Sequence, residues 1–345
     1  MAVNFGIIGC GAIAQRRHLP EGRRARHANI VAVVDPNEKR VREIADQYDA
    51  EAFTDHKKML KGADVDAVVV CGPNSLHAQQ AVDALRAGKH VLCEKPMATT
   101  KRDCKRMIAE ASKRNRHLMV GMNQRFEPVH VKAKELIDQG AIGKPLTFRT
   151  AFKHSGPEAW SLDGAKSWFF DPDAAVLGCL GDLGVHKVDL VRFLLNDEFA
   201  EVNALIETLH KKAKGGKKLG LDDNALLNLR SKKGAIGHVE VSWTNYADEA
   251  NETVIFGTDG VLRIGADPEF GVVVRKRGGG RECYDVGAMA TNQAQTTSGI
   301  IEHFSDRLHR NRKPEITGDD AYKSVNVIFA AMDSARLGKN VKIVD

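Results

Sequence analysis

The 345-residue chain lacks several features that would define its class at once. It has no apolar run near the roughly 18 residues that a membrane helix needs, so we expect no membrane span. Its first residues lead straight into an apolar segment, without the charged and apolar regions of a secretory signal. Internal repeats and low-complexity tracts are also missing. We therefore expect a globular protein of the cytoplasm.

The six cysteines form no C-x-x-C pair, and three of them lie in or beside expected buried strands. This spacing is unlike a zinc site or a disulfide framework and indicates reduced thiols. The net charge of +6 comes from short basic runs at 23–26, 211–218 and 275–281 rather than from a continuous basic stripe interleaved with aromatics. We therefore expect neither a metal nor a nucleic-acid partner.

The first part of the chain alternates apolar runs with helical patterns. Runs such as Ile30–Val34 and Ala67–Val70 are apolar on both faces, which is typical of a parallel sheet covered by helices on both sides. The pattern predicts a doubly wound α/β domain over residues 1–123. The other expected elements are strands Val3–Ile8, Glu51–Thr54, His90–Cys93 and Leu118–Gly121, and helices Asn37–Tyr48, His77–Ala87 and Lys101–Arg114.

The rest of the chain has a different pattern of apolar residues and turns. A length of 345 residues is also too great for one ordinary hydrophobic core, so we expect a second domain. Long alternating strands are separated by Gly-rich turns, with few helices between them. We predict a second, α+β domain over residues 124–345, with an antiparallel sheet and helices on one side. Its expected strands are Leu146–Phe152, Glu201–Leu209, Asp223–Arg230, Ala235–Trp243, Thr253–Phe256 and Val272–Arg275, and its expected helices are Pro128–Gln139, Gly181–Leu195, Ile300–Arg310 and Asp319–Leu337.

The first strand ends in a G-x-G-x-x-A motif at residues 9–14. The first glycine permits a tight turn, the second lets a pyrophosphate approach the backbone, and the alanine allows close packing of the following helix. The N-terminus of that helix offers free N–H groups to phosphates. Asp35 ends the second strand, where an acid accepts hydrogen bonds from the ribose hydroxyls. The predicted dinucleotide-binding residues are Gly9, Gly11, Ala12, Ile13, Ala14 and Asp35.

The same aspartate bears on the choice of cofactor. A carboxylate at Asp35 repels a 2′-phosphate, which favours NAD over NADP. Lys39 and Arg40 are close in sequence and could soften that repulsion, so NADP stays open as an alternative.

Three further segments follow the fourth, fifth and sixth strands, where ligands of such sheets bind. In "GPNSLHA", Pro73 and Asn74 form a turn, and Asn74 is expected to cap the next helix. "CEKPMA" and "GMNQRF" follow the next two strands and should lie at the mouth of the nicotinamide site. The candidate cofactor residues here are Pro73, Asn74, His77, Glu94 and Lys95.

A second group of polar residues opens the helix predicted at Gly181. Asp182, His186 and Asp189 are spaced i, i+4, i+7, which places them on one face of an α-helix. Gly184 is a poor helix former, so its presence indicates that another group packs closely there. From these residues alone, Asp182 could be a helix cap and His186 a core histidine. A metal site is not favoured, because no second histidine follows at H-x-x-x-H spacing.

With both groups of residues considered, the chain resembles the Gfo/Idh/MocA oxidoreductases over nearly its whole length. The resemblance is carried by "GIIGCGAIA", "VVDPN", "GPNSLHAQQAVDALRAGKHVLCEKPMA", "GMNQRF" and "GDLGVHKVDL". It implies a Rossmann domain followed by an α+β domain with a large open-faced sheet, which often mediates homodimers or homotetramers.

The resemblance also implies roles for single residues. Lys95 would contact substrate and nicotinamide, and the bond before Pro96 would be cis. Asp182 and His186 would complete the catalytic group, with His186 as the acid/base. Further residues near the substrate would be Arg125, Trp168 and Trp243.

The expected activity is hydride transfer between NAD and a secondary alcohol of a sugar or cyclitol. Anionic sugars, such as phosphates and uronates, are among the candidate substrates. Two alternatives remain open at this point. One is an NAD-dependent glycosidase that begins with the same oxidation, and the other is a non-catalytic regulator that binds a dinucleotide and a sugar.

Overall fold

A computed structural model describes residues 2–213, 215–287 and 298–344. The chain forms two compact units. Counting described residues only, the first unit holds those within 1–123, 160–176 and 295–322, and the second holds those within 124–159, 177–294 and 323–345. We predicted 124–345 to be one domain, but the chain returns to the first unit twice after residue 123.

The first unit is built on a six-stranded sheet in which every neighbouring pair is parallel. The strand order is β3-β2-β1-β4-β5-β6. The chain therefore adds strands outward on one side of β1 and then crosses over to add β4, β5 and β6 on the other side. Such a crossover leaves a crevice at the carboxyl ends of the strands. The strands are β1 Val3–Ile8, β2 Ala28–Val34, β3 Glu51–Phe53, β4 Ala67–Val70, β5 His90–Cys93 and β6 Leu118–Val120.

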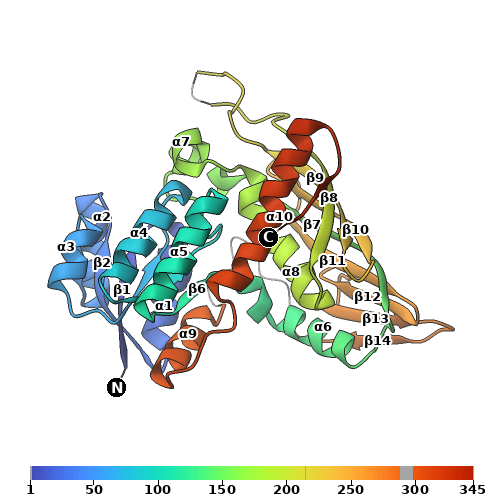
Figure 1. The fold of residues 1–345 in the computed structure, drawn as a ribbon, viewed down its shortest axis with the longest axis horizontal. Coiled ribbons are helices and arrows are strands. Elements are labelled where there is room, and N and C mark those ends of the chain that lie inside the picture. The colour runs from blue at the N-terminus through green and yellow to red at the C-terminus, as the bar shows by residue number, and fades with distance from the viewer. Residues whose placement is uncertain (1, 214, 288–297, 345) are drawn as a thin grey trace. The chain divides into compact units, whose positions relative to one another are not determined.

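Helices connect these strands and cover the sheet (Figure 1). All four residues of β4 are buried, as expected for a strand covered on both faces. Helices α4 and α5 pack against each other, and α1 packs against β2 and α9. The helices of this unit are η1 Ala14–His18, α1 Leu19–Arg24, α2 Glu38–Tyr48, α3 His56–Gly62, α4 Asn74–Arg86, α5 Lys101–Arg114, η4 Gly164–Lys166, η5 Trp168–Phe170, α7 Pro172–Ala175 and α9 Ile300–His309.

The second unit is built on a nine-stranded sheet of order β14-β13-β12-β11-β7-β10-β9-β8-β15. All neighbouring pairs are antiparallel except β7 and β10, which are parallel. The strands are β7 Pro145–Lys153, β8 Phe199–Glu207, β9 Asn224–Ser231, β10 Ile236–Ser242, β11 Ala250–Gly257, β12 Gly260–Ile264, β13 Val272–Lys276, β14 Arg281–Tyr284 and β15 Val341–Lys342.

Figure 1 shows α6, α8 and the later part of α10 on one side of this sheet. The strands alternate accordingly, so that in β9 Ala225, Leu227 and Leu229 are buried and the residues between them face the other way. The longer helices are α6 Pro128–Asp138, η6 Leu180–Gly184, α8 Val185–Leu195 and α10 Gly318–Leu337, and two short ones are η2 Asn123–Phe126 and η3 Pro157–Ala159.

The predicted fold class is confirmed, and the differences are local. Helix α4 begins at Asn74 rather than His77, and Asn74 is not its cap, because its side-chain amide donates to the Ala175 carbonyl at 2.9 Å. Sequence analysis missed α3 and the strands β12, β14 and β15, which are short and carry little periodic signal. In the described part of the chain, no helix is both long and apolar enough to cross a bilayer.

Candidate active site

A cavity of about 560 Å³ lies within the first unit, at the carboxyl ends of β1, β2 and β4. Its volume falls in the usual range for small-molecule sites. Six residues predicted from the sequence to bind a dinucleotide line it: Gly9, Gly11, Ala12, Ile13, Asp35 and Pro73.

The two glycines of the motif have different structural requirements. Gly9 has φ +98°, and a Cβ on it would lie 2.9 Å from the backbone of Cys71. Gly11 has ordinary backbone angles, and a Cβ on it would meet no atom within 4 Å. Gly9 is therefore required by the fold, whereas the open space at Gly11 fits a group that approaches the backbone from the cavity, as a pyrophosphate does.

Asp35 is held in place by backbone hydrogen bonds. It is buried, and its carboxylate accepts from the N–H of Cys10 and from the N–H of Asn37, both at 2.9 Å. Each oxygen keeps a further lone pair for a ligand hydroxyl. The residues of this cavity therefore fit the phosphates and the adenosine ribose of a dinucleotide.

Asn74 and His77 were predicted to bind the cofactor, but they do not line this cavity. Both are buried. The ring nitrogens of His77 lie 2.8 Å from the Pro96 carbonyl and 2.9 Å from the Gly72 carbonyl, and burial lowers the pKa of this histidine. His77 thereby ties together the loops that follow β4 and β5.

Glu94 follows β5 and is also turned away from the cavity. Its carboxylate lies 2.9 Å from His18 Nε2 and 3.7 Å from Arg17 Nη1. Burial disfavours the charged form, but the hydrogen bond from His18 and the charges of His18, Arg17 and Lys95 outweigh it and lower the pKa of Glu94. The peptide bond between Lys95 and Pro96 is cis, which confirms the prediction.

A segment far along the chain completes the cavity, and Trp168 was the one residue of it that sequence analysis named. Trp168, predicted near the substrate, lies here, with its ring stacked 3.9 Å from that of Phe169. The ring of Trp160 packs edge-on against Phe169 at 5.1 Å. No periodic or motif signal connects this segment with residues 9–14. Its lining residues are Trp160, Ser161, Leu162, Asp163, Ser167, Trp168 and Phe169.

The second unit holds Asp182 and His186, both buried. Asp182 lies in η6, a wide turn closed by the hydrogen bond from the Val185 N–H to the Leu180 carbonyl. Trp243 has no exposed surface, and its Nε1–H donates to Asp182 at 3.1 Å. Trp243, predicted near the substrate, is therefore a fully buried residue that contacts Asp182 through its indole N–H. The His186 ring lies 6.3 Å from that of Phe152.

Asp182, His186 and Asp189 were expected on one face of a single α-helix, but Asp182 lies in η6 and only His186 and Asp189 lie in α8. The wide turn of η6 interrupts α-helical spacing, and Asp189 binds a different group of side chains. Arg125 donates to both oxygens of Asp189, at 2.6 and 2.7 Å, and Ser324 donates at 2.7 Å. Arg125, predicted near the substrate, thus forms a bidentate ion pair with the buried Asp189.

Lys187 is a buried cation that sequence analysis did not single out. It has no exposed surface, and its Nζ donates to Asn251 Oδ1 at 2.7 Å and lies 6.0 Å from the Phe152 ring. Burial lowers its pKa to about 7, although the charge of Glu252 opposes the shift. Its position directly after His186 in "VHKVD" was the only available signal.

Within the described ranges, no three His, Cys, Asp or Glu side chains come together in a way that could hold a metal ion. The chemistry that the first unit supports is dinucleotide binding on a Rossmann sheet. A Rossmann sheet of this kind, in a chain that also carries the buried Asp182 and His186, is typical of NAD-dependent oxidoreductases.

The family follows from similarity to known proteins. Residues 3–122 match the oxidoreductase family with an NAD-binding Rossmann fold, and residues 130–263 match the GFO/IDH/MocA C-terminal domain. The chain belongs to the GFO/IDH/MocA oxidoreductase family. It is a dehydrogenase or reductase that uses NAD.

The similarity covers almost the whole length of some relatives and about two thirds of others. Myo-inositol 2-dehydrogenase of Thermotoga maritima is 28% identical over 99% of this chain and 98% of its own length. Levoglucosan dehydrogenase of Pseudarthrobacter phenanthrenivorans is 32% identical over 67% of this chain and 63% of its own. The aldose-aldose oxidoreductase of Caulobacter crescentus, solved with glycerol, covers 99% of this chain and 100% of its own at 29% identity, with a TM-score of 0.84.

The difference between the two glycines predicts separable effects on folding and binding. Gly11→Ala should keep the wild-type thermal midpoint but weaken NAD binding at least about tenfold, because the methyl group occupies the space of the pyrophosphate. Gly9→Ala should lower the thermal midpoint as well. Calorimetric titration with NAD and a thermal melt measure both. Unchanged NAD affinity in Gly11→Ala would contradict this use of the cavity.

Lys187 predicts a pH dependence of stability. Its pKa is about 7 in the folded protein and 10.5 when unperturbed, so the unfolded chain binds more protons between these values. Stability from this group therefore rises with pH from about 7 towards 10.5 and is level below 7. Compared with Lys187→Met, the wild type should gain denaturant resistance between pH 7 and 9. The urea midpoint of each protein is measured as a function of pH. If the two midpoints change in parallel with pH, the pKa of Lys187 is not lowered by folding.

Proposed function

We propose that this protein transfers a hydride between a secondary alcohol of a sugar or cyclitol and NAD. The observation that carries the proposal is the end-to-end similarity to enzymes named for such substrates, among them myo-inositol 2-dehydrogenase. The NAD cavity of the first unit and the buried Asp182 and His186 of the second support it. Sugars with a phosphate or a carboxylate belong to the range of substrates that the proposal covers.

The cavity lined by the glycine motif and Asp35 would hold NAD, which would supply the hydride acceptor for oxidation of the secondary alcohol to a carbonyl. His186 takes the proton of the same hydroxyl group, a role that suits histidine because its ordinary pKa lies near neutral pH. Lys95 donates a hydrogen bond to the substrate oxygen and stabilises the negative charge that develops on it. Asp182, held by Trp243, orients the substrate or the imidazole. In the reverse direction His186 returns the proton.

A cytoplasmic location belongs to the same proposal. All six cysteines have free thiols, including the buried Cys10, Cys93 and Cys179. Burial raises the pKa of the Cys10 thiol to about 12, so this thiol stays protonated and unreactive near neutral pH. Unpaired, unreactive cysteines are typical of proteins kept in a reducing compartment.

The activity is tested by following NADH at 340 nm with the purified protein. We expect NADH formation with NAD and at least one member of a panel of free, phosphorylated and nucleotide-linked sugars and inositols. Release of an aglycone without accumulation of NADH would instead indicate a glycosidase. NAD and sugar binding without turnover of any panel member would indicate a regulator. Either result would contradict the dehydrogenase assignment.

Single substitutions test the proposed catalytic roles of Lys95 and His186. Lys95→Ala and His186→Ala should each lower kcat about 100-fold or more, with the dissociation constant for NAD nearly unchanged. Lys113→Ala is the matched control, because it removes an exposed lysine of α5 in the same unit as Lys95. Wild-type turnover in either site variant would remove that residue from the mechanism.

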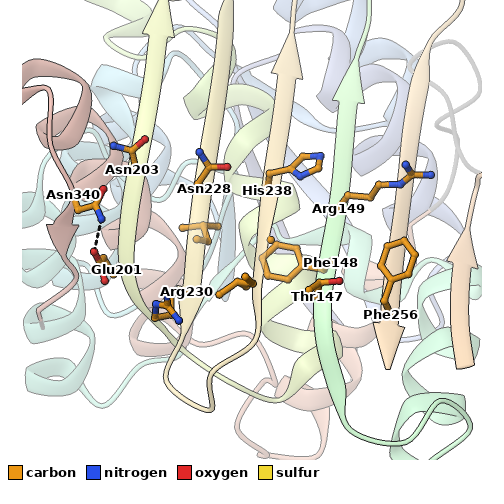
Figure 2. Close-up of a pocket in the computed structure, with 13 residues that line it drawn as sticks. Thr147, Phe148, Arg149, Glu201, Asn203, Asn228, Arg230, His238, Phe256 and Asn340 are labelled. Atoms are coloured by element: carbon orange, nitrogen blue, oxygen red, sulfur yellow. Dashed lines mark hydrogen bonds between the residues drawn. The ribbon is translucent and has the colours of Figure 1, made fainter. Parts of the chain in front are cut away.

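We also propose that the protein is a homo-oligomer that buries the open face of its nine-stranded sheet. A shallow cavity of about 590 Å³ lies on this face. Asn203, Asn228, His238 and Arg149 form one row across it (Figure 2). The next row includes the directly opposed Leu205 and Leu226, which are 68% and 49% exposed. Paired exposed leucines on a flat sheet favour packing against a second copy.

The oligomer predicts a specific effect of one substitution. Leu226→Asp should shift the mass measured by light scattering from an oligomer to a monomer, because it would bury a charge in the interface. Leu337→Asp is the control, since Leu337 is 46% exposed but ends α10. A wild-type protein that is monomeric at all concentrations would contradict the proposal.

A further inference from the structure

The adenosine end of the NAD cavity is enclosed by two segments that are far apart in the sequence. One is the start of α2, which carries Arg40, and the other is the loop at Ser161–Asp163. They are joined by an ion pair in which Arg40 Nη2 lies 2.9 Å from Asp163 Oδ1. Arg40 Nη1 also lies 3.8 Å from Asp35 Oδ2. One guanidinium is therefore shared by two carboxylates.

The residues that line the cavity carry more negative than positive charge. Of the described lining residues, Arg40 alone carries a permanent positive charge, against the three carboxylates of Asp35, Asp55 and Asp163. His56 also lines the cavity, but its Nε2 is engaged by Asp83 at 3.0 Å. Asp55 accepts the N–H of Lys57 and caps α3. An incoming phosphate would thus find only Arg40 as a cationic partner.

Arg40 is in the right place for a phosphate but is already occupied. A guanidinium beside the ribose-binding acid is well suited to a 2′-phosphate, which it can hold with two parallel hydrogen bonds. Here the guanidinium donates to Asp163 instead, and Asp163 adds a second negative charge close to Asp35. Asp35 itself is kept in position by two backbone N–H groups.

We propose that Asp163 is a specificity-determining residue that excludes NADP by occupying Arg40. Asp35 repels the 2′-phosphate directly, and Asp163 withholds the one cation that would otherwise offset this repulsion. NAD, which carries two hydroxyl groups on the adenosine ribose, needs no cation at this position. The proposal concerns the cofactor alone and does not depend on which alcohol the enzyme oxidises.

The ion pair has little weight in folding. The side chains of Arg40 and Asp163 are 23% and 49% exposed, and ion pairs in such positions contribute little to stability because water screens them. Removing the charge of Asp163 should therefore leave the thermal midpoint close to that of the wild type, so that effects on cofactor binding can be measured in a folded protein.

The test compares the dissociation constants of NAD and NADP for the wild type and Asp163→Asn, by titration of the fluorescence of the lining tryptophans Trp160 and Trp168. Asn keeps the shape of the side chain and removes its charge. NADP binding should tighten about tenfold, the effect of one favourable charge interaction of about 1.4 kcal/mol, while NAD binding changes less than about threefold. Added salt should reduce the gain.

Two further variants make the result specific. Asp46→Asn removes an exposed charge from the same helix, outside the cavity, and should leave the ratio of the two constants unchanged. Arg40→Ala in the Asp163→Asn background should abolish the gain for NADP.

An unchanged ratio in Asp163→Asn would overturn the proposal. So would an equal loss of affinity for both cofactors, because the pair would then only hold the loop at Ser161–Asp163 in place. A gain for NADP that survives the loss of Arg40 would also overturn it.

Discussion

The buried carboxylate of Glu94 is the charge on which the carboxyl edge of the six-stranded sheet depends. A buried charge is costly unless it is paired. Glu94 is paired with His18 and Arg17 from η1, the helix that follows the glycine motif, and it also accepts the N–H of Lys95. One carboxylate therefore joins the helix after the glycine motif to the end of β5. The backbone of Lys95 takes its position from that arrangement.

The second unit also contains buried carboxylates that are held by hydrogen-bond donors, namely Asp182 and Asp189. Asp182 accepts from the fully buried Trp243, and Asp189 accepts from Arg125 and Ser324. Each buried carboxylate thus has a donor from a segment that is distant in the sequence. The wide turn of η6 carries two glycines that no larger residue could replace without a shift, because a Cβ would clash with Leu177 at Gly181 and would lie 2.7 Å from Leu180 at Gly184. His186, the residue proposed for proton transfer, lies next to this turn, in the first turn of α8.

Much of the first unit could be predicted because its signals are local. The strand that ends in residues 9–14 and the acid at Asp35 are recognised by spacing alone, and both line the cavity. Asn74, His77 and Glu94 are also at the carboxyl edge, as predicted, but they turn inward to satisfy buried partners. Position along a strand is readable from the sequence, whereas the direction of a side chain depends on the groups that surround it.

The sequence by itself determined the fold class, the glycine motif and acid that line the cavity, and the chemical identity of the residues at both polar groups, because these depend on periodicity and on short motifs. Only the tertiary structure decided which distant residues meet. It placed Trp168 in the NAD cavity, paired Arg125 with Asp189, and brought Asp163 to Arg40, 123 residues away. Such contacts arise when the chain returns to a unit that it has left, and no local pattern encodes that return.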